Sequence, residues 1–157
     1  MLAAVVVALA GASVAPNALN ASDPNAWACP VCGIPYSGAS YASKPKVTFT
    51  GGQTLAIGGD GPLHIGGGCV KLFNEDPAKY LASDPLPITP SRAGQNATCP
   101  VSGETFVVPA DADASYIQFN HGQVIYTCCP HCVDKLKANL TNFIASFPKE
   151  VASVEAQ

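Results

Sequence analysis

Charged residues are scarce in this 157-residue chain. Asp, Glu, Lys and Arg make up only 12% of it, and the formal net charge is -3. The Lys and Arg residues form no basic cluster, so the sequence lacks the positive face that nucleic-acid-binding proteins turn toward phosphates. We therefore expect no nucleic-acid partner, and the mild acidity by itself indicates no other partner.

Long apolar runs are also missing, except at the N-terminus. Leu2 to Val14 are all apolar or small, which matches the core of a secretory signal and is short for a bilayer span. A small-x-small cleavage pattern follows at residues 13–15. We predict a signal peptide or N-terminal apolar segment over residues 1–21, with export to the periplasm or the exterior. An uncleaved segment could instead associate weakly with a membrane or anchor the chain there.

The usual sequence signs of an enzyme are absent. The three glycines at 66–68 are not followed by the Lys and Ser or Thr that a phosphate-binding loop needs. Asp111 and Asp113 have no nearby base or nucleophile, so we interpret them as a polar loop. We expect a protein without catalytic residues.

Glycine, proline and cysteine are what the chain has in quantity. It contains 14 Gly, 14 Pro and seven Cys. Many glycines and prolines indicate turns and irregular structure, which leave little regular structure for a large core. Small loop-rich domains are commonly stabilised by disulfides or by a metal ion, and seven cysteines could supply either.

An internal repeat organises these cysteines. The segment Cys-Pro-Val-Cys-Gly at 29–33 recurs as Cys-Pro-Val-Ser-Gly at 99–103. Downstream of each lies a second cluster, Gly-Gly-Gly-Cys-Val-Lys-Leu-Phe at 66–73 and Cys-Cys-Pro-His-Cys-Val-Asp-Lys-Leu at 128–136. A repeat of this kind predicts two copies of one supersecondary unit.

A proline-rich stretch separates the copies. Three prolines fall within 85–90, which favours a semi-rigid extended linker. We predict a first module over 22–83, a linker over 84–97 and a second module over 98–157.

Each module is predicted to contain a tight turn, a β-hairpin and a helix. β-favouring residues indicate strands at 47–49 and 54–57 in the first half. In the second half they indicate strands at 104–108, 115–120 and 123–127.

The helices are predicted after the hairpins. The first should run from about Cys69 to Ser83, bent or split at Pro77. The second should begin near Pro130 and continue until Pro148. Its apolar residues recur at steps of three and four, as on one face of a helix: Leu136, Leu140, Phe143, Ile144 and Phe147.

The cysteine spacing suits metal ligation. Two cysteines on a tight turn, and two more one helical turn apart at the start of a helix, can direct four sulfurs at one ion. Cys128 and Cys132 have the second spacing. The helix dipole there favours thiolates.

The pattern resembles the TRASH and YHS families. Their Cys-Pro-Val-Cys-Gly-like knuckle, hairpin and Cys-x3-Cys helix start are all represented here, and Asp-Pro-Ala-Lys-Tyr-Leu at 76–81 is similar to their Pro-x-x-Tyr tail. The resemblance covers about 27–82 and 97–147. It implies a treble-clef type of module and a role in sensing, moving or storing soft metals such as Zn or Cu.

Each half departs from four cysteines. Aligning Cys69 with Cys132 places Ile65 opposite Cys128, so the first half has three of the four ligands, and Ser102 leaves the second half with three. The predicted metal ligands are Cys29, Cys32, Cys69 and His64 in the first half, and Cys99, Cys128 and Cys132 with Cys129 or His131 in the second.

From these residues we expect an α+β protein of two small tandem treble-clef-like modules that binds Zn or Cu(I) for metal handling, storage or trafficking outside the cytosol. Two alternatives stay open. In an oxidising compartment the cysteines could instead form disulfides that staple a secreted interaction module. Cys129-Pro-His-Cys132 also matches the dithiol motif of thioredoxin-like oxidoreductases, although few residues follow it to complete that fold.

Overall fold

The computed structural model describes residues 28–36, 43–58, 68–84, 93–110 and 114–149. Four predicted features lie outside these ranges: the apolar segment 1–21, His64 with its neighbour Ile65, the proline-rich stretch 85–90, and the polar loop with Asp111 and Asp113. Within the described part of the chain, no helix is long and apolar enough to cross a membrane.

The first half contains a hairpin followed by a helix. Strand β1 (Lys46–Phe49) pairs antiparallel with β2 (Thr54–Ala56), with Val47 opposite Leu55. Helix α1 (Gly68–Glu75) ends just before Pro77, and a 3-10 turn, η3 (Pro77–Tyr80), follows. The predicted split at Pro77 is therefore confirmed.

The second half has the same order, and the strand pair at its knuckle corresponds to the isolated antiparallel bridge between Ala28 and Pro35 in the first half. Strands β3 (Asn96–Thr98) and β4 (Thr105–Val107) flank the second knuckle. Strands β5 (Ser115–Gln118) and β6 (Val124–Thr127) form a hairpin, and the short turn η4 (Asn120–Gly122) joins them. Helix α2 (Pro130–Ala138) follows this hairpin. The predicted strands of both halves are present, each within a few residues of the expected bounds.

The prediction that the second helix continues to Pro148 is wrong. Helix α2 ends at Ala138; a 3-10 turn, η5 (Leu140–Phe143), and strand β7 (Ile144–Ser146) follow. The exposed edge of β1 offers hydrogen bonds to this segment, and Thr50 N–H donates to Phe143 O at 2.8 Å. Those sheet bonds, together with the weak helix propensity of Thr, Asn, Phe and Ile, outweigh the helical pattern of apolar residues.

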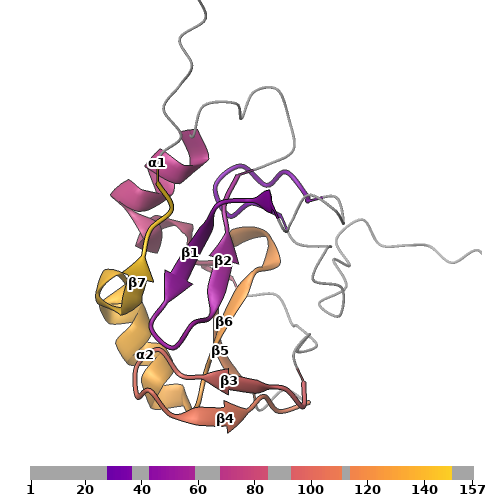
Figure 1. The fold of residues 1–157 in the computed structure, drawn as a ribbon, viewed down its shortest axis with the longest axis vertical. Helices are drawn as coiled ribbons and strands as arrows, with labels where there is room; N and C mark the ends of the chain where they lie inside the picture. The colour runs from indigo at the N-terminus through magenta and orange to yellow at the C-terminus, as the bar shows by residue number, and fades with distance from the viewer. Residues whose placement is uncertain (1–27, 37–42, 59–67, 85–92, 111–113, 150–157) are drawn as a thin grey trace, which may run out of the picture.

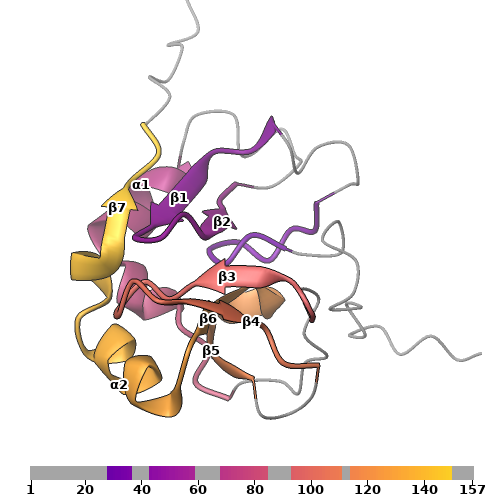
Figure 2. The ribbon, with the colours of Figure 1, turned by 60° about the horizontal axis from the view of Figure 1, so that its bottom comes forward.

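Strand β7 joins the end of the chain to its beginning. It pairs antiparallel with β1, giving a three-stranded sheet in the order β2-β1-β7. Figure 1 shows β7 beside β1, and Figures 1 and 2 both show the two helices on the same side of the molecule.

The first half makes the reciprocal contact. Leu81, just after η3, forms an isolated antiparallel bridge with Phe119, at the end of the β5 hairpin. Ile144 holds the same place after η5 and pairs with Phe49 of β1. Each half thus extends the tail of its helix onto the hairpin of the other half.

Two buried glutamines connect the hairpins. The Gln53 side chain accepts a hydrogen bond from Tyr126 N–H at 2.9 Å and donates to Tyr126 O at 2.7 Å and Thr98 O at 2.8 Å. Because a buried amide is costly unless its hydrogen bonds are made, these three bonds fix where the second half lies against Gln53.

Gln123 makes the mirror set of bonds in the opposite direction. Its side chain accepts from Ala56 N–H at 2.8 Å and donates to Ala56 O at 2.8 Å and Ala28 O at 2.9 Å. Gln53 and Gln123 are 70 residues apart, the same offset as the two knuckles. The two halves are therefore packed as a pseudo-twofold pair.

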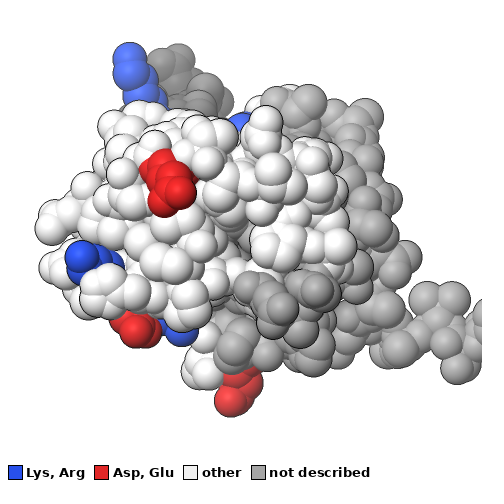
Figure 3. Space-filling view, turned by 90° about the horizontal axis from the view of Figure 1, so that it is seen from below, with Lys and Arg blue, Asp and Glu red and all other residues white. Residues whose placement is uncertain are grey.

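One hydrophobic core spans both halves. Its aromatic centre consists of Phe49, Phe73 and Phe119, with Phe73 to Phe119 ring centroids 5.9 Å apart. The core also contains Cys29 and Cys69, so the first cysteine cluster lies against it. Charged side chains are scattered over the face in Figure 3 and do not gather into a patch.

Candidate metal centres

Each Cys-Pro-Val knuckle is a closed turn. Cys29 N–H donates to Ile34 O at 3.1 Å and Gly33 N–H to Cys29 O at 2.9 Å. Cys99 and Gly103 repeat these two bonds at 2.8 Å and 2.9 Å. Both glycines have positive φ, 72° and 73°, which residues with a side chain adopt only at a cost. The local sequence thus dictates the same turn twice.

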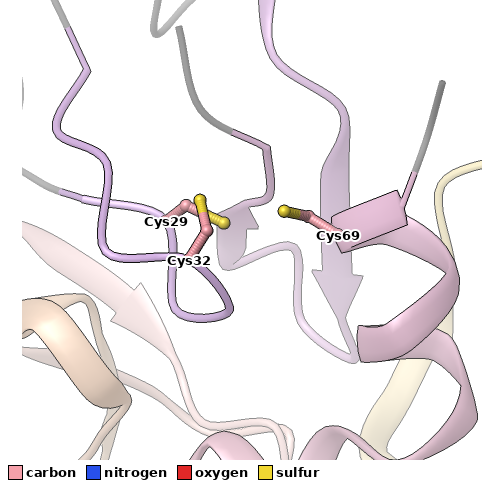
Figure 4. Close-up of side chains that lie close together, drawn as sticks. All are labelled: Cys29, Cys32 and Cys69. Carbon is pink, nitrogen blue, oxygen red and sulfur yellow. The ribbon is translucent and has the colours of Figure 1, made fainter. Parts of the chain in front are cut away.

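The first cluster combines a knuckle with a helix start. Cys29 and Cys32 lie on the knuckle, and Cys69 lies in the first turn of α1 and points toward them (Figure 4). The three sulfurs lie within 4.8 Å of one another. Cys29 and Cys69 are buried and Cys32 is half-buried. This spacing allows three thiolates to contact one ion.

The second cluster has the same plan with different members. Cys99 comes from the knuckle, while Cys128 and Cys132 come from the end of β6 and the first turn of α2. Their sulfurs also lie within 4.8 Å of one another. Cys99 and Cys132 are buried and Cys128 is half-buried. Each cluster therefore draws its cysteines from one half of the chain only.

Gly58, and not Ile65, occupies the place of Cys128 in the first half. Gly58 N–H donates to the Cys29 sulfur at 3.2 Å, and Cys128 N–H makes the same bond to the Cys99 sulfur. Gly58 and Cys128 are again 70 residues apart. The alignment through the later cysteines misplaced this position because the first half has seven more residues between hairpin and helix.

Ser102 replaces the second knuckle cysteine and still contacts its cluster. Its hydroxyl oxygen lies 3.4 Å from the Cys128 sulfur and accepts a hydrogen bond from Glu104 N–H at 3.2 Å. Each cluster thus lacks a different cysteine of a four-cysteine set, the first at Gly58 and the second at Ser102.

A fourth thiol adjoins the second cluster. Cys129 is the N-cap residue of α2, and its sulfur lies 3.4 Å from the Cys132 sulfur and 3.9 Å from the Cys128 sulfur. The Cys128 and Cys132 sulfurs are 3.6 Å apart. Cys129 is outside the set that includes Cys99. The second cluster therefore consists of two sulfur triangles that share one edge.

Burial raises the thiol pKa values in the first cluster. Desolvation raises the pKa of Cys32, with a backbone hydrogen bond at Ile34 acting against it. Desolvation also raises the pKa of Cys69 well above its ordinary value, and the nearby Cys29 sulfur adds to the shift. Without a cation, Cys32 and Cys69 therefore favour the protonated thiol.

The second cluster contains shifts in both directions. Burial raises the pKa of Cys99, but hydrogen bonds from Cys128 N–H and from Ser102 outweigh it and lower the pKa to about 6. A hydrogen bond from Cys132 N–H lowers the pKa of Cys129, whereas burial raises the pKa of Cys132. The second cluster therefore favours a thiolate at Cys99 without a bound cation.

Two histidines lie outside both clusters. His131 is exposed on α2 and is not in the second sulfur set, so the structure does not bring this predicted ligand together with the cysteines. His121 has a left-handed backbone, φ 67°, where the equivalent Gly51 has φ 88°. Its ring lies against Gly33 of the first knuckle. It lies in the turn η4.

Sequence reasoning missed Gln53, Gln123 and Gly58. The signal was present, because a constant offset of 70 runs from the knuckles through the hairpins to Gly58 and Cys128. Over its described residues, the chain is a small α+β protein with two helices, several hairpins and two three-cysteine clusters. Comparison of the chain with family models, with curated proteins and with solved structures found no match.

Proposed function

We propose that this chain is a soft-metal-binding protein that holds one Zn or Cu(I) ion in each three-cysteine cluster and acts in metal handling without turnover. The observation that carries the proposal is the convergence of three sulfurs to within 4.8 Å at two places that the repeat makes equivalent. Thiolates select soft metals such as Zn and Cu(I).

The chemistry of the two clusters supports binding over a purely structural thiol core. Burying three thiols together raises the pKa values of Cys32 and Cys69, and a bound cation would reverse that shift by stabilising the thiolates. Three thiolates leave a tetrahedral ion with one open position, which suits an ion that must be passed on.

The division of the sequence into two similar modules is part of the same proposal. Knuckle, hairpin and helix start recur in each half, as in treble-clef modules of the TRASH and YHS type. We assign the chain to that class of module, and we place the protein outside the cytosol on the apolar segment at residues 1–21. Both assignments rest on sequence patterns.

The test is the metal content of the intact chain purified without chelator, measured by native mass spectrometry. Two ions are expected in the wild type and one each in Cys29→Ser and Cys99→Ser. The exposed Asp134→Asn on α2 is the matched control and should keep two. A metal-free chain whose mass is lowered by paired cysteines would support the disulfide-stapled alternative and overturn the proposal.

A second candidate function rests on Cys129 and Cys132. Their sulfurs are 3.4 Å apart, and the pKa of Cys129 is lowered while that of buried Cys132 is raised. An accessible low-pKa thiol beside a buried partner is typical of thiol-disulfide exchange. Reduction of a disulfide substrate by the metal-free chain, abolished in Cys129→Ser, would favour this candidate.

A further inference from the structure

The second cluster contains two sulfur triangles that share the edge between Cys128 and Cys132. Its inner triangle is formed by Cys99, Cys128 and Cys132. Its outer triangle is formed by Cys128, Cys129 and Cys132, with sulfur separations of 3.9, 3.6 and 3.4 Å. Three sulfurs bound in a plane at about 2.3 Å from one ion are about 4.0 Å apart. The outer triangle is therefore close to the size that a three-coordinate ion needs, and no edge of the inner triangle exceeds 4.8 Å.

We propose that the second cluster binds two Cu(I) ions, one in each triangle, with the Cys128 and Cys132 thiolates bridging both. This inference rests on the proposed function and extends it, because the chain would then carry three Cu(I) ions. Cys99 would be the terminal ligand of the inner ion and Cys129 that of the outer ion.

The number of ligands selects Cu(I) over Zn for this arrangement. Four thiolates that share one edge supply three ligands to each of two ions. Soft thiolate sites suit Cu(I), whereas Zn in a protein almost always takes four ligands. A second Zn at the same edge would need water to complete its coordination.

Charge and access agree with the proposal. Four thiolates and two monovalent ions leave two negative charges at the start of α2, where the helix dipole favours them. Cys99 is fully buried, but Cys129 is half-buried at the N-cap, so the outer ion would lie nearer to solvent. The outer triangle is thus the position from which an ion can exchange.

The first cluster has no matching feature among the described residues. The place of Cys128 is taken by Gly58, and the place of Cys129 lies in the range that the structure does not describe, where the sequence has no cysteine. No second thiolate triangle can therefore form there, and we expect a single Cu(I).

The experiment is anaerobic titration of the intact reduced chain with Cu(I) against a competing chelator, with the bound count read by native mass spectrometry. The wild type should bind three ions and Cys129→Ser two. Serine is a preferred N-cap residue, so the start of α2 should be kept. The ion in the first cluster is the internal control for folding.

X-ray absorption of the fully loaded protein gives a second readout. A copper–copper scattering path is expected in the wild type and should be lost in Cys129→Ser. Two ions in both proteins, without that path, would overturn the inference and leave the proposed function standing. Failure of either cluster to bind Cu(I) or Zn would instead overturn the proposed function.

Discussion

The two cysteine clusters are built on one backbone plan but differ in which cysteine is missing. The first lacks the thiol that follows the hairpin, where Gly58 stands, and the second lacks a knuckle thiol, where Ser102 stands. Burial raises the pKa of the helix-start thiol in both clusters, at Cys69 and at Cys132, whereas hydrogen bonds from Cys128 N–H and Ser102 lower the pKa of Cys99 in the second cluster to about 6. The repeat thus fixes the geometry of the sites, while single substitutions within it set their chemistry.

The largest expected effect tests whether the two buried glutamines, which make equivalent hydrogen bonds, also contribute equally to stability. Gln53→Leu and Gln123→Leu each remove three hydrogen bonds of a buried side-chain amide and leave backbone groups of the other half unsatisfied. Each should lower the free energy of unfolding by about 3 kcal/mol, since a buried unsatisfied group costs about 1–3 kcal/mol.

Urea unfolding of the metal-free chain measures both losses. The exposed Asp134→Asn on α2 is the control and should leave the free energy of unfolding nearly unchanged. A large loss in one glutamine variant alone would break the symmetry that the hydrogen bonds indicate.

The next effect concerns the missing fourth ligand. Ser102→Cys would place a thiol where the hydroxyl already lies 3.4 Å from the Cys128 sulfur. Residues that only hydrogen-bond to metal ligands change metal affinity by up to about a hundredfold. A direct fourth ligand should contribute more, so the Zn affinity of the second cluster should rise by at least about a hundredfold. Competition with a chromophoric chelator measures it.

The matching change in the first cluster should fail. Gly58 has φ 99°, a conformation that residues with a side chain rarely adopt, so Gly58→Cys should destabilise the chain before it adds a ligand. Equal gains in Zn affinity at both clusters would contradict the proposed difference between them.

A smaller effect separates the two knuckles. Gly33→Ala and Gly103→Ala both place a side chain at positive φ, and each should cost about 1–2 kcal/mol. Only at Gly33 would the new Cβ meet another side chain, the His121 ring at 3.0 Å. Thermal unfolding should therefore show the larger loss for Gly33→Ala.

The histidine provides the control for that difference. In a His121→Ala background the two glycine variants should cost the same, because the ring is gone. A difference that survives in this background would place its cause elsewhere in the knuckle.

The smallest signal to be measured is the absorbance change of a single thiolate with pH. Because the pKa of Cys99 is lowered from 9.0 to about 6 in the folded chain, its thiolate stabilises the fold above pH 9 and this stabilisation is lost as the pH falls through about 6. Ultraviolet absorbance of thiolates in the metal-free chain should show a step near pH 6. The step should disappear in Cys99→Ser and remain in Cys29→Ser.

The sequence predicted which cysteines lie together better than it predicted the C-terminal end of the fold. Both cysteine sets follow from a tight turn and a helix start, which are local features. Whether Phe143 and Ile144 continue the helix is not decided locally, because these residues bond to β1 and its following turn in the other half. A helical pattern of apolar residues cannot distinguish that outcome from a longer helix.

Aligning the two halves through Cys69 and Cys132 gives the wrong register of the repeat for a related reason. Aligning the halves by cysteine identity ignored the longer segment between hairpin and helix in the first half. The hairpin residues Gln53 and Gln123 carry the true register, yet a buried glutamine gives no hydrophobic signal. Only the partners in the other half reveal why those side chains are inside.

The segment after each helix pairs with the hairpin of the other half, and this pairing has a consequence for the order of folding. Thr50 finds its partner Phe143 only 93 residues later in the chain. At about 5–20 residues per second, synthesis leaves the edge of β1 unpaired for roughly 5–20 s. Such distant pairing also slows folding, because a long loop must close before the contact forms. The thiols of the first half are therefore made well before β7, the strand that completes the sheet of the first half.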